Sequence, residues 1–246
     1  MLKKLFTITF AIITLLSVNV FPVMAASTDD FMTYEEFERL QEENIVGKDV
    51  TYVQLKELQK ESISFEKALE SNASFNKVFD NTILSTRSIS IKSGDVIITN
   101  STSSSGLLGH SAIALGSNEI LDIPGPGKSV RTLTVSAFCN DYADGWIKVY
   151  RPTTSSWGTS AATWARSTYK GSNAVYKITN NINSTNETYC SKIVFQAYKF
   201  GVGSSAFNTY YHEQGDYYGS DYNLVTGIIA PYTLPTSLSV GLKGNL

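Results

Sequence analysis

The sequence predicts an α+β fold, in which an antiparallel sheet packs against helices and follows an N-terminal helical extension. Three observations favour this class. Residues 28–80 are charged and carry apolar residues at helical spacing, residues 89–150 hold short apolar runs separated by turns, and residues 189–200 form one apolar helical face. Helices, then antiparallel strands, then helices around one core indicate an α+β protein.

Residues 1–25 predict a secretory signal peptide. Lys3 and Lys4 form a basic start, residues 5–20 are an apolar run, and residues 22–25 offer small residues for cleavage. The apolar run is short for a membrane span and lacks a basic stop-transfer flank, although a retained anchor is the alternative. We therefore expect a secreted, extracellular protein that could associate with the cell wall. We expect no stable membrane span after signal cleavage.

Residues 26–85 predict a helical N-terminal extension of three short helices. Thr33 and Glu36 have the spacing of a capping box, and Thr51 and Gln54 repeat this signal. The apolar pairs expected to face the core are Phe37 with Leu40, Leu55 with Leu58, and Phe65 with Leu69. A pro-segment that shields the active site is one hypothesis for this extension.

Residues 86–246 predict the main domain, with five strands followed by two helices. The predicted strands are residues 94–99, 109–115, 119–123, 130–135 and 146–150, and the predicted helices are residues 160–169 and 189–200. Residues 116–118 read as the turn between the second and third strands. The tail after Pro231 shows little pattern, so we expect a loop there.

Charge and composition limit the class of partner. The net charge of −2 becomes −4 once Lys3 and Lys4 are removed, and Lys and Arg do not cluster. An acidic chain of this kind is a poor candidate for binding nucleic acid or an anionic membrane. A mature chain of about 220 residues can bury a core without disulfides.

The chain has two Cys and two His residues. In an exported protein, a disulfide between Cys139 and Cys190 is the first alternative to a reactive thiol. A zinc site built from these cysteines, His110 and His212 is disfavoured because no two of the four lie within five residues. We expect no metal and no other cofactor.

The helix at Cys190 carries the strongest chemical signal. Its apolar face consists of Cys190, Ile193, Val194, Ala197 and Tyr198, and its polar face of Lys192, Gln196 and Lys199. Cys190 therefore lies in the first turn, and Thr188 is the predicted N-cap. The N–H groups and dipole of a helix start stabilise a thiolate and can hold an oxyanion. A buried structural cysteine is the alternative.

His110 is the candidate base for this thiol. On a strand it shares one face with Ala112 and Ala114, whose small side chains leave room for a partner helix or a substrate. A histidine beside Cys190 would allow the thiol to ionise near neutral pH.

Asp122 is the candidate third residue, and its role depends on strand register. If residues 116–118 form a three-residue loop, Ala112 faces Asp122 and His110 becomes a diagonal neighbour, at roughly 7–8 Å between backbones. The carboxylate could then fix the imidazole tautomer. A two-residue loop would move Asp122 to the opposite face, and a hydrogen bond to the backbone is the structural alternative.

Together these segments resemble a known family, the permuted NlpC/P60 enzymes of the YiiX/YebB type. The resemblance rests on Gly94-Asp95-Val96-Ile97, Gly109-His110-Ser111-Ala112-Ile113-Ala114-Leu115, Glu119-Ile120-Leu121-Asp122, Thr188-Tyr189-Cys190-Ser191-Lys192-Ile193-Val194, Ala197-Tyr198 and Ile229-Ala230-Pro231-Tyr232-Thr233-Leu234. It covers roughly residues 90–236, and the Tyr-Cys-Ser helix combined with the upstream Gly-His strand is its strongest part.

The resemblance implies a papain-like fold in which His precedes Cys along the chain. It implies Cys190 as nucleophile, His110 as base and Asp122 as the polar third residue. This chain departs from the family at Lys192, where an acidic residue is usual, and at Asp122, where Glu is common. We interpret Lys192 as surface variation, whereas the shorter Asp122 leaves the orientation of His110 less defined.

We therefore predict a secreted cysteine hydrolase that cleaves amide bonds, with cell-wall peptides as the expected substrate. Lipid amide or ester cleavage and acyl transfer are alternatives within the same chemistry. A noncatalytic wall-binding module stapled by the Cys139–Cys190 disulfide is the alternative from another class. His212 is expected to be a solvated loop residue rather than a substrate contact.

Overall fold

A computed structural model describes residues 31–79, 89–104, 107–208 and 227–246 of the chain. The predicted signal peptide at residues 1–25 and the loop residue His212 lie outside the described residues.

Two helices form the N-terminal part, α1 (Tyr34–Glu42) and α2 (Tyr52–Phe79). The Thr33 side chain caps α1 by accepting a hydrogen bond from the Glu36 N–H at 3.2 Å, as the capping motif predicts. The prediction of two separate helices after residue 51 is wrong, because α2 runs on without a break. Its sequence contains no Gly or Pro to end it.

Six of the described strands form one antiparallel sheet with the order β4-β3-β2-β1-β5-β8, and β6 and β7 form a separate two-stranded parallel sheet. The strands of the antiparallel sheet are β1 (Val96–Ser104), β2 (Leu107–Gly116), β3 (Glu119–Asp122), β4 (Arg131–Leu133), β5 (Ile147–Pro152) and β8 (Val240–Asn245). Strands β1 to β5 correspond to the five predicted strands, although their first and last residues differ from the predicted ones. The expectation of a loop in the tail is wrong, because β8 forms the edge beside β5. With two glycines and several exposed side chains, it lacks the alternation of a half-buried strand.

Three longer helices surround this sheet, namely α3 (Val135–Asp141), α4 (Ser155–Tyr169) and α5 (Cys190–Gly201). The smaller elements are β6 (Val175–Tyr176), β7 (Glu187–Thr188), η1 (Ser204–Ala206), η2 (Pro231–Thr233) and α7 (Leu234–Ser237). Helix α3, whose N-cap is Thr134, was not predicted from the sequence. Cys139, expected before a turn, lies within this helix.

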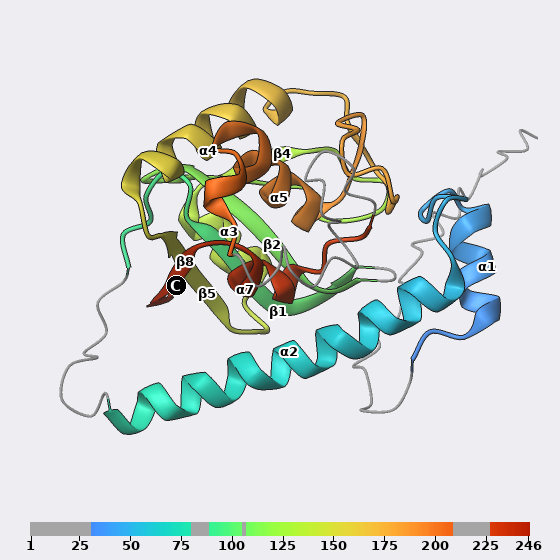
Figure 1. The fold of residues 1–246 in the computed structure, drawn as a ribbon, viewed down its shortest axis with the longest axis horizontal. Coiled ribbons are helices and arrows are strands. Elements are labelled where there is room, and N and C mark those ends of the chain that lie inside the picture. The colour runs from blue at the N-terminus through green and yellow to red at the C-terminus, as the bar shows by residue number, and fades with distance from the viewer. Residues whose placement is uncertain (1–30, 80–88, 105–106, 209–226) are drawn as a thin grey trace, which may run out of the picture. The chain divides into compact units, whose positions relative to one another are not determined.

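The two faces of the sheet carry different helices. Ile113 and Leu115 of β2 belong to the large core with α4 and α5, which lie side by side over the strands (Figure 1). Ala112 and Ala114 belong to a smaller core with Phe138 of α3. Helix α5, which carries Cys190, therefore covers one face of the sheet, and α3 is the partner helix that occupies the space above His110 on the other face.

The N-terminal helices share the large core. Leu40 of α1 and Leu55 and Leu58 of α2 belong to the same buried cluster as the apolar residues of α5. Residues Phe31–Leu246 form one compact unit. Among the described helices, none combines the length and apolar character needed to cross a bilayer.

Candidate active site

Cys190 is the first residue of α5, and its thiol is buried, with 1% of the residue exposed. The N-cap is Tyr189, whose side chain does not cap the helix, so the prediction of Thr188 as N-cap is wrong. Thr188 instead pairs with Tyr176 in the small parallel sheet of β6 and β7. The N–H groups of the first turn are therefore not occupied by an N-cap side chain, and they remain next to the sulfur.

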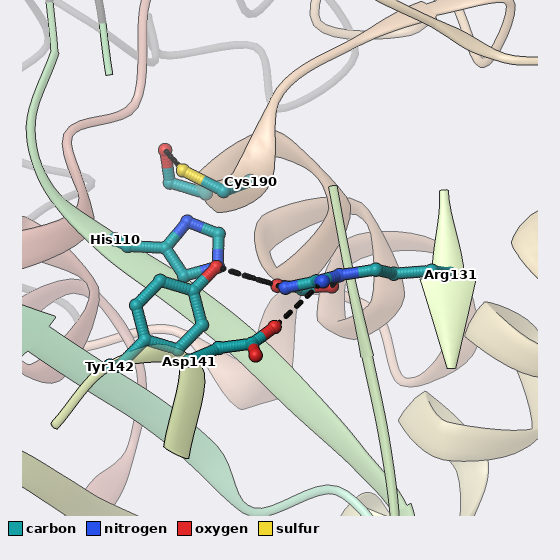
Figure 2. Close-up of polar contacts among 7 residues, drawn as sticks. His110, Arg131, Asp141, Tyr142 and Cys190 are labelled. Carbon is teal, nitrogen blue, oxygen red and sulfur yellow. Dashed lines mark hydrogen bonds and ion pairs between the residues drawn. The ribbon is translucent and has the colours of Figure 1, made fainter. Parts of the chain in front are cut away.

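His110 lies on β2 and is fully buried. Its Nε2 atom is 3.0 Å from Oδ2 of Asp122, and its ring stacks on Tyr142 at 4.8 Å between ring centroids. Nδ1, the other ring nitrogen, makes no hydrogen bond by geometry within the described part of the chain. Figure 2 shows Cys190 and His110 pointing toward one another, with Tyr142 and Arg131 on the far side of the imidazole. The structure thus brings Cys190, His110 and Asp122 together.

The thiol and the imidazole shift each other's protonation. Burial alone would lower the pKa of His110, but Asp122 and Cys190 together raise this pKa to about 9. Burial alone would raise the pKa of Cys190, but His110, the Ser111 backbone N–H and Ser191 lower it overall. At neutral pH this geometry favours an imidazolium facing a thiolate.

The position of Asp122 depends on a β-bulge. Ile113 pairs with Leu121 and Ala114 with Ile120, and continuing this register places Ala112 opposite Asp122, as predicted. The connecting turn nevertheless has only two residues, because Gly116 pairs with Glu119. A register shift between Ala114 and Gly116 takes up the extra residue and keeps Asp122 on the face of His110.

Asp122 has further partners that the sequence reading missed. Its carboxylate accepts hydrogen bonds from Arg131, with Nε to Oδ1 at 2.9 Å, and from the Tyr142 hydroxyl at 2.9 Å. Arg131 also forms an ion pair with Asp141 at 2.8 Å. Burial alone would raise the pKa of Asp122, but His110 and Arg131 lower it overall, which keeps the carboxylate ionised. The pairing of β3 with β4 places Arg131 directly opposite Asp122. A correct prediction of this strand register would have been needed to identify Arg131 as a partner of Asp122.

The polar side of α5, formed by Lys192, Gln196 and Lys199, is buried. Lys192 is 0% exposed, donates a hydrogen bond to the Glu187 carbonyl at 2.7 Å, and has its pKa lowered to about 8 by burial. Gln196 donates to the Ser184 carbonyl at 3.0 Å, and Lys199 to the Asn183 side chain at 2.9 Å. The segment before α5 therefore covers this side, and the interpretation of Lys192 as surface variation is wrong.

The residues that flank Cys190 fix the segment at Ile229. The Ile229 N–H donates to the Tyr189 hydroxyl at 3.0 Å, and the Ser191 hydroxyl donates to the Ile229 carbonyl at 2.6 Å. Tyr232 follows in η2, and its ring packs so closely on Gly109 that a Cβ there would lie 2.5 Å from the Tyr232 Cζ atom. These contacts could not be predicted from the sequence, because they join residues about forty and over a hundred positions apart.

Both cysteines are free thiols, so the disulfide alternative is wrong for this structure. Cys139 is partly exposed on α3, and burial raises its pKa, whereas the pKa of Cys190 is lowered. Within the described ranges, no group of three His, Cys, Asp or Glu side chains could hold a metal ion.

Comparison with known proteins identifies a family. A family model described as "Lipoprotein N-acylation protein LnsA-like" matches residues 58–237, which is most of the chain. This chain belongs to the LnsA-like family. The match begins within α2, upstream of the predicted main domain.

Two further proteins are similar to this LnsA-like chain. An uncharacterized 30.3 kDa protein from Bacillus thuringiensis is 38% identical over 166 residues, which cover 63% of this chain. The match spans 56% of that relative's length. The crystal structure of the metalloprotein YiiX from Escherichia coli O157:H7 aligns with a TM-score of 0.47 and 16% identity. That alignment covers 64% of this chain and 99% of YiiX.

Proposed function

We propose that this protein is a cysteine enzyme that takes an acyl group onto Cys190 as a thioester and passes it to an amine. Cys190 would be the nucleophile, His110 the acid and base, and Asp122 the third member of a papain-like triad, as in NlpC/P60 enzymes. One observation carries the proposal. A buried thiol with a lowered pKa faces a buried imidazole whose pKa is raised to about 9.

The residues present can perform each proton transfer. The Cys190 thiolate attacks the donor carbonyl, and the N–H groups at the start of α5 stabilise the oxyanion. Protonated His110 donates its proton to the leaving group as the donor bond breaks, which leaves a thioester. Neutral His110 then accepts a proton from the incoming amine while the amine attacks the thioester carbonyl. The products are an amide, the free thiolate and the imidazolium.

The surroundings of the thiol favour an aliphatic acyl group. Cys190 belongs to the large apolar core, Tyr232 packs on Gly109 next to His110, and Trp146 lies 6.0 Å from Tyr232 between ring centroids. Exclusion of water from such a site slows hydrolysis of a thioester and favours transfer to an amine. The family description, lipoprotein N-acylation, names the same kind of acceptor.

Cleavage of cell-wall peptides is the competing function, because it uses the same nucleophile and passes through the same thioester. It was predicted from the expected export and from the resemblance to NlpC/P60 enzymes. The two functions differ in donor and acceptor. Acyl transfer needs a lipid donor and an amine, whereas peptide cleavage needs a peptide amide and water.

The test is to trap the thioester and identify its acyl group. Purified protein is incubated with phospholipid vesicles or with cell-wall peptides, and its intact mass is measured before and after hydroxylamine. We expect vesicles to add a fatty acyl mass that is lost with hydroxylamine, and Cys190→Ala and His110→Ala to prevent it. Cys139→Ser, which removes the other thiol, is the matched control and should leave the adduct unchanged. Release of peptide fragments without lipid adduct would support wall cleavage instead.

We also propose that the protein is exported by the segment at residues 1–25, which would place the thiol outside the cytoplasm beside envelope substrates. Neither nucleic acid nor a stable membrane span is part of this proposal. The mass of the protein recovered from the producing cell tests it. Loss of the first 25 residues supports export, and retention of Met1 in a soluble cell fraction contradicts it.

A further inference from the structure

The Asp122 carboxylate contacts two further side chains, Arg131 and Tyr142, in addition to the His110 imidazole. Oδ2 lies 3.0 Å from His110 Nε2, 2.9 Å from the Tyr142 hydroxyl and 3.3 Å from Arg131 Nη2, while Oδ1 accepts from Arg131 Nε at 2.9 Å. Figure 2 shows Arg131 and Tyr142 converging next to His110, on the side away from Cys190.

These contacts come from three elements. Asp122 ends β3, Arg131 starts β4 directly opposite it, and Tyr142 is the C-cap of α3. Asp141 of α3 holds a second nitrogen of Arg131, Nη1, at 2.8 Å. The guanidinium is therefore fixed between two carboxylates, one fully buried and one 43% exposed. A bidentate Arg–carboxylate pair restricts direction as well as distance.

The Tyr142 ring has a second function in this geometry. It stacks on the imidazole at 20° between ring planes while its hydroxyl donates to the same Oδ2 atom that faces His110 Nε2. Burial and the Asp122 charge raise the pKa of the hydroxyl, so it remains a donor at neutral pH. One side chain thus fixes both members of the His110–Asp122 pair.

We infer that Arg131 and Tyr142 are positioning residues for the nucleophile: they fix Asp122 as an anion aimed at His110 Nε2, so that His110 Nδ1 faces Cys190. The inference rests on the proposed function of this site, and goes beyond it by assigning roles to two residues that hold Asp122 rather than the thiol. In the permuted NlpC/P60 enzymes that this chain resembles, Glu is common at this position, and Asp122 is shorter. The inference explains how Asp122 can still define the orientation of the imidazole.

The charged and titratable groups around Asp122 determine the expected pH effects. They are His110 from β2, Arg131 from β4, Asp141 and Tyr142 at the end of α3, and Cys190 from α5. Removing the Arg131 charge makes the surroundings more negative and loosens Asp122. Both changes disfavour the thiolate, so the pKa of Cys190 should rise.

The test is a titration of the Cys190 thiolate, followed by its ultraviolet absorbance in a Cys139→Ser background. We expect Arg131→Gln to move the midpoint upward by about one pH unit, which lowers the thiolate fraction about tenfold below the midpoint. Arg131→Lys should restore part of the shift, since lysine keeps the charge but cannot bind the carboxylate in a bidentate way. Tyr142→Phe, which keeps the stacking ring, should give a smaller upward shift.

Lys128→Gln is the matched control, because it removes one positive charge from an exposed side chain and leaves Arg131, Asp122 and His110 intact. We expect its thiolate midpoint to match that of the parent protein. If Arg131→Gln does not fold, Arg131→Lys and Tyr142→Phe decide the outcome. Unchanged midpoints in the folded variants, with only a lower melting temperature, would overturn the inference and leave Arg131 as a link between β3, β4 and α3.

This titration needs no substrate, so it separates the inference from the proposed function. A depressed midpoint that depends on Arg131, in a protein that never forms a thioester, would support the positioning roles and contradict acyl transfer. An ordinary thiol midpoint that His110→Ala does not change would contradict both.

Discussion

The protonation of His110 depends on its two neighbours more than on its own burial. Burial opposes the imidazolium, yet the pKa is raised to about 9 because Asp122 and Cys190 both favour the cation. The sequence predicted these three residues from helix position, strand alternation and turn length. It did not predict Arg131 or Tyr142, because their contacts depend on the β3–β4 register and on a helix, α3, that has only seven residues.

Asp122→Asn should shift the alkaline limit of activity to lower pH. The charged pair exists above the pKa of Cys190 and below the pKa of His110, so activity should rise through the first and fall through the second, near pH 9. Asparagine removes the negative charge, so the His110 pKa falls and the upper limit moves toward neutral pH. Activity at neutral pH should drop about 100-fold or more. The pH profile of kcat/KM measures both effects.

Asp122→Glu is the control for that experiment, since it keeps the charge and changes the geometry. We expect lower activity with the alkaline limit still near its original pH. An Asp122→Asn enzyme whose alkaline limit does not move would show that another group, not His110, sets it.

At the scale of elements, strand β2 shows how a local irregularity sets the site. The bulge before Gly116 keeps Asp122 in register, and Gly109 turns the chain with φ +74° just before His110. Sequence reasoning identified the strand and the residues on its faces correctly. Alternation defines two faces but does not say which helix covers each one, so the placement of α5 on one face and α3 on the other could not be predicted.

Gly109→Ala should destabilise the protein by about 2–4 kcal/mol, because a side chain at positive φ is strained and its Cβ would collide with the Tyr232 ring. Gly116→Ala is the matched control on the same strand, since a Cβ there meets nothing within 4 Å. Denaturant unfolding measures both variants. Equal stability of the two alanine variants would contradict the close packing of η2 on β2.

Helix α5 carries a buried amine that should make stability depend on pH. The pKa of Lys192 is lowered to about 8 in the folded chain, whereas an unfolded lysine has a pKa of about 10.4. Between these values the unfolded chain binds more protons, so wild-type stability should rise with pH across this window. Lys192→Met removes this dependence but loses the hydrogen bond to Glu187, at a cost of about 1 kcal/mol.

The melting temperature of Lys192→Met minus that of wild type should therefore be higher near pH 7 than near pH 10. Lys128→Met, at an exposed lysine, is the control and should show little pH dependence in this difference. A difference that is constant across the window would show that Lys192 is protonated equally in the folded and unfolded chains.

At the scale of the whole molecule, the open question is whether the N-terminal helices are an appendage or part of the fold. Charge and capping motifs predicted these helices, but they could not show what the apolar stripes cover, since that depends on contacts far along the chain. In the structure, Leu55 and Leu58 belong to the same buried core as α5. The neighbouring Gln54 side chain accepts a hydrogen bond from the Asn180 side chain at 3.1 Å. The boundary at residue 85 between the N-terminal extension and the main domain remains a prediction. The hypothesis that the extension is a pro-segment also remains a prediction.

Leu55→Ala should lower the stability of the whole described chain by about 2–5 kcal/mol, because Leu55 is fully buried in the shared core. Val53→Ala, two residues away and 67% exposed, should change stability by less than about 0.5 kcal/mol. All three tryptophans, Trp146, Trp157 and Trp164, lie outside the N-terminal helices, so their fluorescence reports the sheet and α4, while circular dichroism reports the helices as well. If residues 31–246 unfold as one unit, both probes follow a single transition that Leu55→Ala moves to lower denaturant. A fluorescence transition that Leu55→Ala leaves in place, with only the circular dichroism changed, would mean that α1 and α2 unfold separately and that the extension is an independent segment.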